Sequence, residues 1–224
     1  MPGILTISGW GQPHDALSVI APDAMHVDFA RHHSAHAAMA DIAAHMSEPD
    51  IVVGWSLGGQ LAVRAIAAGM LKPKKLVLIA SPFQFVKRPE LPIGMPPYLF
   101  EKFRDNYSKN PERTLAKAWE LIAMDDTHAD RVRSHIAQQD KQAVLSKDWL
   151  RWLDLLEAFS CEDLHFADFP PTTLIHGDSD LVVYPEQSLR FSQSIPHAKL
   201  LSIFGCGHAP HWHDTQAVRQ AMYE

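Results

Sequence analysis

The chain has 224 residues, 46% of them hydrophobic and 21% charged, which is the composition of a globular protein with one domain and a substantial core. The formal net charge is −6, and no segment carries the basic excess of a nucleic-acid-binding protein. The two cysteines lie far apart and no apolar run is long enough to cross a membrane, so we expect a cytoplasmic monomer without disulfides.

Short apolar runs that end in turn residues predict six strands along the chain. Segments with apolar residues at helical spacing separate several of these runs, and strand-helix-strand connections of this kind give parallel strand pairs. The expected fold class is therefore α/β, with a mostly parallel sheet flanked by helices. The predicted strands are Ile4–Ile7, Ala24–Asp28, Ile51–Trp55, Lys75–Ala80, Thr172–Ile175 and Ala198–Phe204.

A long helical block interrupts this alternation. From Tyr98 to Phe159 the pattern is helical, with predicted helix starts at Asn110, Thr127 and Ser146. The block is too long for one crossover helix, which needs only about a dozen residues. We therefore expect a core made of residues 1–82 and 169–224, with residues 83–168 inserted as a helical cap.

The third predicted strand leads into a Gly-x-Ser-x-Gly motif centred on Ser56, and a helix of small residues follows. This order is typical of a nucleophile elbow, in which glycines flank the serine because a Cβ there would clash with the neighbouring strand or helix. Gly54 and Gly58 occupy those positions. The motif predicts that Ser56 is the nucleophile of an acyl transfer and that the Leu57 N–H points at the substrate oxyanion.

A second oxyanion donor is expected in the loop after the first strand, Ser8-Gly9-Trp10-Gly11. The backbone N–H of Trp10 is the candidate. The alternative is a plain turn with a packed tryptophan side chain.

Two later strands end in residues that complete a triad. One is followed by Asp178 and Asp180 and the last one by His208, so nucleophile, acid and histidine appear in the order that α/β-hydrolases use. Such a histidine accepts the serine proton, and the carboxylate holds its tautomer. We favour Asp180 as the acid because it follows the Gly177 turn by three residues and can reach back towards His208; Asp178 would then hold the turn.

The C-terminal histidines also suggest a metal site. His208, His211 and His213 form a His-x-x-His-x-His pattern, but no further ligands stand at a recognised spacing. The triad is the better interpretation of His208, and we expect no metal ion or other cofactor.

Five stretches are similar to the alpha/beta hydrolase superfamily, and within it to the pimeloyl-[acyl-carrier protein] methyl ester esterases of biotin synthesis. Ser8 stands where that family has a histidine, and we expect the family's hairpin ahead of Ile4 to be missing. The resemblance implies a triad of Ser56, Asp180 and His208, oxyanion donors at Trp10 and Leu57, and a cap over the acyl chain. The similar stretches are Ser8–Gly11, Gly54–Gly59, the cap segments Trp119–Met124 and Trp152–Leu164, and Gly207–Pro210.

These observations predict a serine carboxylesterase that cleaves the ester of a medium-length acyl chain. The substrate is expected to be either a small ester or an ester carried on an acyl carrier protein. A thioesterase or a C–C hydrolase would need the same triad, and a protein that only binds ligands could share the scaffold. The intact triad argues against a silent binding protein.

Basic residues on the predicted cap offer a docking face for an acidic acyl carrier, because a local positive patch raises encounter rates. The alternative is ordinary solvated surface, since acidic residues lie close in sequence and exposed ion pairs contribute little. The candidate docking residues are Arg113, Lys117, Arg131 and Arg133.

Overall fold

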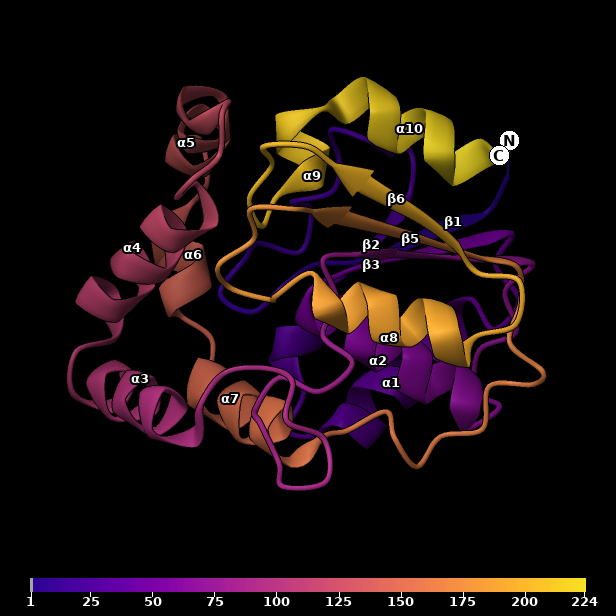
Figure 1. Ribbon diagram of the computed structural model, residues 1–224, viewed down its shortest axis with the longest axis horizontal. Helices are drawn as coiled ribbons and strands as arrows, with labels where there is room; N and C mark the ends of the chain where they lie inside the picture. Colours follow the sequence, from indigo (N-terminus) through magenta and orange to yellow (C-terminus); the bar gives the residue numbers. More distant parts are fainter. Residues whose placement is uncertain (1) are drawn as a thin grey trace.

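The computed structural model describes residues 2–224 and contains a six-stranded sheet with helices on both faces (Figure 1). The strand order is β2-β1-β3-β4-β5-β6, and every neighbouring pair is parallel. The predicted α/β class is therefore confirmed. The strands are β1 (Ile4–Ile7), β2 (Met25–Val27), β3 (Ile51–Trp55), β4 (Lys75–Ile79), β5 (Thr172–Gly177) and β6 (Lys199–Ile203).

The central strands are buried because helices cover both faces of the sheet. Every residue of β3 and of β5 is buried, whereas β6, at the edge of the sheet, is largely exposed. Helices α1, α2 and α8 cover one face, and α9 and α10 cover the other (Figure 1). These helices are α1 (Ala35–His45), α2 (Leu57–Ala67), α8 (Glu186–Ser194), α9 (Pro210–His213) and α10 (Thr215–Tyr223), and a short 3-10 turn, η1, spans Phe29–Arg31.

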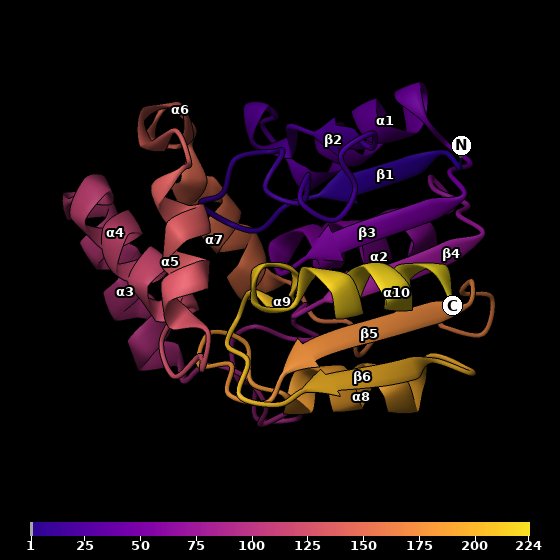
Figure 2. The ribbon, with the colours of Figure 1, turned by 90° about the horizontal axis from the view of Figure 1, so that it is seen from above.

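Five helices follow β4 in the chain and precede β5. They lie together beyond the carboxyl ends of the strands, towards which the strand arrows point (Figure 2). In parallel α/β sheets this end is where ligands bind. The helices are α3 (Pro97–Lys109), α4 (Pro111–Ile122), α5 (Ala129–Ala137), α6 (Lys141–Leu145) and α7 (Trp149–Ala158). None of the helices in residues 2–224 is both long and apolar enough to cross a membrane.

One predicted helix start in this block is confirmed and two are wrong. The Asn110 side chain accepts a hydrogen bond from the Arg113 N–H and caps α4 as expected. Thr127 does not cap α5, whose first residue is Ala129, and Ser146 does not cap α7. The side chain of Asp148 caps α7 instead, because two residues further along the chain this carboxylate reaches the free N–H groups of the first turn.

Aromatic contacts join the helical block to the turn after β1. The Trp10 ring packs edge-to-face against Phe103, Tyr107 and Trp149, with centroids 5.4, 5.1 and 5.9 Å away. Its indole N–H donates to the Trp149 carbonyl at 2.8 Å, and the Trp119 indole donates to the Gly11 carbonyl at 2.9 Å. Packing and hydrogen bonds with α3, α4 and α7 thus fix the turn that carries the expected oxyanion donor.

Candidate active site

Ser56 lies at the turn between β3 and α2, in a backbone conformation that few non-glycine residues adopt. Its φ and ψ are 54° and −123°, and its N–H donates to the Ile79 carbonyl of the neighbouring strand at 2.9 Å. A Cβ on Gly58 would collide with the carbonyl oxygens of Ile7 and Ser8, and one on Gly54 would lie 2.5 Å from the Gly59 Cα. The local geometry is that of a nucleophile elbow.

Gly58→Ala is expected to lower the free energy of unfolding by about 2–3 kcal/mol or more, because the added methyl group meets backbone atoms that cannot rotate away. Gly3→Ala is the matched control, since a Cβ there meets its nearest atoms at an ordinary 3.8 Å. Urea denaturation of both variants measures the difference. Equal stability of the two variants would contradict the close packing of the elbow.

Asp180 pairs with His208 inside the protein. The Nδ1–H of His208 donates to Oδ2 of Asp180 at 2.7 Å, while the N–H groups of Val182 and Val183 donate to Oδ1 at 2.8 and 3.0 Å. Burial raises the pKa of Asp180, but the attraction of His208 and hydrogen bonds from His176 and His208 outweigh this and hold the pKa well below its usual value. With Nδ1 protonated, Nε2 is the nitrogen that can accept a proton.

Asp178 has a different environment. Its Oδ1 accepts from the Gly205 N–H at 2.7 Å and from the Ser179 hydroxyl at 3.0 Å, and its side chain is exposed. This carboxylate ties the turn after β5 to the turn after β6. Of the two neighbouring acids, the structure brings Asp180 to the histidine.

His176 is a buried contact of Asp180 for which the sequence pattern suggested no role. Its Nε2 lies 3.2 Å from Asp180 Oδ2 and donates to the Val183 carbonyl at 2.8 Å, and its Nδ1 accepts from the Ser188 hydroxyl. The only sequence signal for such a role was a histidine inside a buried strand. Its partners Val183 and Ser188 come later in the chain, in the turn before α8 and in α8 itself.

The two expected oxyanion donors flank the serine. Leu57 is the first residue of α2, so its N–H has no acceptor inside the helix. The turn Gly9-Trp10 passes so close to the serine that a Cβ on Gly9 would be 3.3 Å from the Ser56 Cβ. Both the serine and the turn therefore face one small space.

Ser56 and His208 line the same apolar cavity, which has a volume of about 90 Å³. Its walls come from the turn after β1, from α3, α4 and α7, and from the loop after β4. Such a lining suits a hydrocarbon chain attached to the carbonyl that the serine would attack. The largest apolar wall residues are Trp10, Trp55, Phe85, Phe103 and Trp119.

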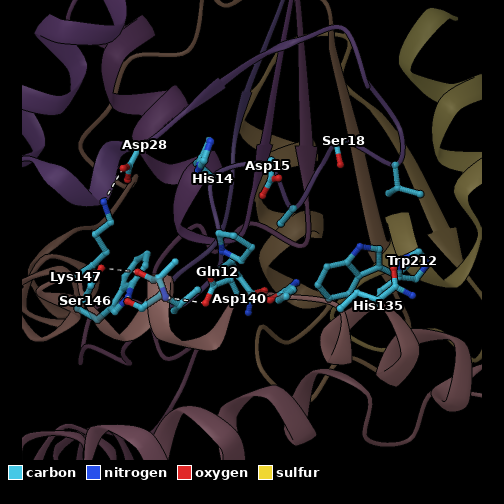
Figure 3. A pocket seen from close by; sticks show the side chains of 18 residues that line it. Gln12, His14, Asp15, Ser18, Asp28, His135, Asp140, Ser146, Lys147 and Trp212 are labelled. Atoms are coloured by element: carbon cyan, nitrogen blue, oxygen red, sulfur yellow. Dashed lines mark hydrogen bonds and ion pairs between the residues drawn. The ribbon is translucent and has the colours of Figure 1, made fainter.

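A second and larger cavity, of about 620 Å³, has Gln12 in its lining (Figure 3). Gln12 is the one residue that lines both cavities, and its Oε1 has no hydrogen-bond partner within residues 2–224. Polar and apolar side chains both line the larger cavity, and its one lysine, Lys147, is paired with Asp28 at 2.7 Å. Its other ionisable lining residues are His14, Asp15, His135 and Asp140.

The remaining histidines of the C-terminal pattern have separate environments. His211 is fully buried against Trp55, and burial lowers its pKa far below the usual value. His213 donates from Nδ1 to Oδ1 of Asp126 at 2.7 Å. Side-chain ligand atoms of Asp126, His213 and Cys206 lie within 4.8 Å of one another, but both Asp126 oxygens accept protein N–H groups and burial raises the pKa of the Cys206 thiol.

The four basic docking candidates are divided by the structure. Arg113 and Lys117 are exposed side by side on α4. Arg131 donates to the His213 carbonyl at 3.2 Å, and Arg133 lies 3.4 Å from carboxylates of Glu120 and Asp130. Two of the four positive charges are therefore engaged within the molecule.

Comparison with known proteins adds a family and several relatives. The model of the alpha/beta hydrolase family matches residues 4–221. Proteins named pimeloyl-[acyl-carrier protein] methyl ester esterase are 26% identical over 165 residues in Nitrosospira multiformis (72% of this chain, 63% of that one) and 29% identical over 165 residues in Nitrosomonas europaea (71% and 64%). The match thus spans less than two thirds of the length of these relatives.

Solved structures agree at the level of the fold. An esterase from Exiguobacterium antarcticum has a TM-score of 0.81 at 14% identity, covering 100% of this chain and 92% of that chain. A bromoperoxidase from Bacillus anthracis has a TM-score of 0.80 at 18% identity, covering 100% and 91%. Both likenesses concern the arrangement of helices and strands alone.

Proposed function

The chain belongs to the alpha/beta hydrolase family, and we propose that it is a serine carboxylesterase with Ser56, Asp180 and His208 as its triad. The observation that carries this proposal is the buried hydrogen bond of 2.7 Å between His208 and Asp180. His208 also lines the same apolar cavity as Ser56, which the elbow holds at a positive φ. A carboxylate, an imidazole and a serine hydroxyl in this relation form the machinery of acyl transfer.

In the proposed reaction the Ser56 oxygen attacks the ester carbonyl while His208 Nε2 accepts the hydroxyl proton. The N–H groups of Trp10 and Leu57 stabilise the negative charge that develops on the carbonyl oxygen. His208 then returns its proton to the departing alkoxide, which leaves as an alcohol and yields an acyl-serine. Water attacks this ester in the same way, and the carboxylic acid and free serine are released.

We propose that residues 83–168 act as a cap that covers the acyl part of the substrate. Helices α3, α4 and α7 supply most of the apolar walls next to Ser56. Names of the relatives suggest the methyl ester of a pimeloyl group on an acyl carrier protein as a substrate. The larger cavity next to Gln12 has polar groups in its lining and would then accept a hydrogen-bonding part of such a substrate, away from the ester.

The proposal is tested with esters and with cells. p-Nitrophenyl esters of graded acyl length should be hydrolysed, and a strain that requires biotin because it lacks its own esterase should grow when it produces this chain. Faster cleavage of matched thioesters than of oxygen esters would indicate a thioesterase of the same fold. Absence of turnover with every ester and thioester would indicate a binding protein.

Removal of the two free positive charges on α4 should weaken the use of a carrier-bound ester. Arg113→Ala combined with Lys117→Ala is expected to lower kcat/KM for that substrate several-fold at low ionic strength and to leave a p-nitrophenyl ester unaffected, because long-range attraction accelerates only the encounter with an acidic carrier. Stopped-flow assays at two salt concentrations measure this effect.

The matched control removes two exposed positive charges elsewhere, through Lys199→Ala and Arg219→Ala. It should leave both substrates unaffected. Similar losses with both substrates would show damage to the cap, and no loss with either would identify Arg113 and Lys117 as ordinary surface residues.

A further inference from the structure

The connection between α4 and α5 is hydrogen-bonded to the loop that carries His208. The His208 N–H donates to the Ile122 carbonyl at 3.3 Å, and the Thr127 N–H donates to the Gly205 carbonyl at 2.8 Å. The Thr127 hydroxyl donates to the same carbonyl at 3.1 Å. These contacts join segments about eighty residues apart in the chain, so the loop of the histidine is fixed partly by the helical block and not by the sheet alone.

Asp126 is the centre of this connection. Its Oδ2 accepts from the N–H of Gly207, the residue immediately before His208, at 2.8 Å. Its Oδ1 accepts from the His213 ring and from the His128 N–H, both at 2.7 Å. The carboxylate side chain has no exposed surface, and a buried carboxylate fixes its donors firmly because a lost partner leaves an unpaired charge.

Helix α4, which ends just before Asp126, also forms a wall of the apolar cavity. Trp119 and Ile122 line that cavity together with Ser56 and His208. The segment that would contact the acyl chain is therefore the same segment that holds the histidine loop in place.

From this geometry we infer that Asp126 is a positioning residue for His208: through Gly207 and His213 it sets the place of the imidazole relative to Ser56. This inference rests on the proposed esterase function. It goes beyond that function because Asp126 touches neither the reacting atoms nor the acyl cavity, and because it makes the helical block part of the catalytic geometry as well as a cover.

Replacement of Asp126 by asparagine removes one of its contacts in either orientation of the amide. An NH₂ group at the place of Oδ2 faces the Gly207 N–H, and one at the place of Oδ1 faces the His128 N–H, so two donors oppose each other. Asp125, the preceding residue, provides a matched control because its own carboxylate is exposed. Asp125→Asn changes the same charge one residue away.

The experiment compares wild type, Asp126→Asn and Asp125→Asn in kcat and KM for p-nitrophenyl butyrate, in the rate of Ser56 labelling by a fluorophosphonate, and in thermal unfolding. Asp126→Asn is expected to lower kcat and the labelling rate about tenfold or more at a KM within about twofold of wild type, because a small displacement of a base slows proton transfer without weakening binding. Asp125→Asn should match wild type. The folded fraction at the assay temperature, taken from the unfolding curves, corrects for any loss of stability.

If Asp126→Asn has the kcat and the labelling rate of Asp125→Asn, the inference is wrong. If Asp126→Asn does not fold, His213→Phe replaces it, since phenylalanine keeps a buried ring but removes the ring N–H that Asp126 Oδ1 accepts. A several-fold loss of kcat at constant KM then supports the inference, and wild-type kcat overturns it. Failure of the proposed function is distinct, because wild type itself would then neither hydrolyse esters nor be labelled.

Discussion

Ser56→Ala is expected to lower ester turnover by about 10³-fold or more while the protein stays folded, because loss of the nucleophile removes the covalent route that the whole triad serves. Alanine fits the space of the serine side chain, and its methyl group tolerates the elbow about as well as the serine Cβ does. The measurement is kcat for a p-nitrophenyl ester together with a thermal unfolding curve.

A fluorophosphonate probe supplies the independent readout. It should label wild type and leave Ser56→Ala unlabelled. Ser81→Ala is the control and should be labelled like wild type. Ser81 is buried beside the elbow, and its hydroxyl donates to the carbonyls of Gly54 and Ile79. Labelling of the Ser56→Ala protein at another serine would refute the assignment of the nucleophile.

Asp180→Asn is expected to reduce kcat by about 10³–10⁴-fold, far more than Asp178→Asn. The N–H groups of Val182 and Val183 require an oxygen at the place of Oδ1, so the amide of an asparagine must turn its NH₂ group towards His208. Two donors would then face each other, and the imidazole would adopt the wrong tautomer.

The Asp178→Asn variant serves as the control for this experiment. An asparagine oxygen at residue 178 can still accept from the Gly205 N–H, so the turn persists and kcat should change by less than about tenfold. Steady-state kinetics of both variants decide the matter. A larger loss at residue 178 than at residue 180 would reverse the assignment of the acid.

The parts of the site that follow from local chain geometry could be predicted from the sequence. The Gly-x-Ser-x-Gly motif fixes the elbow within a few residues, and the end of each predicted strand places Asp180 and His208 at one edge of the sheet. The preference for Asp180 over Asp178 also rested on local reach, and the structure brings Asp180 to within 2.7 Å of the histidine.

Other features depend on contacts between distant segments, which periodicity does not reveal. Asp126 stands in a helix connection whose predicted helix start, Thr127, is wrong because the residue bonds to Gly205 instead. Gln12 has no motif around it, and its position between two cavities depends on helices that lie more than a hundred residues further along the chain. Arg131 and Arg133 were grouped by charge, but their partners His213 and Glu120 lie outside α5 and depend on how that helix packs.

The positive φ of Ser56 sets the stability of the fold against the proposed chemistry at this position. A side chain in such a conformation costs about 1–3 kcal/mol, whereas glycine adopts it freely. Stability and chemistry therefore favour different residues at this position. Glycine would relieve the strain but has no hydroxyl, so the proposed nucleophile is held at this position at a cost in stability.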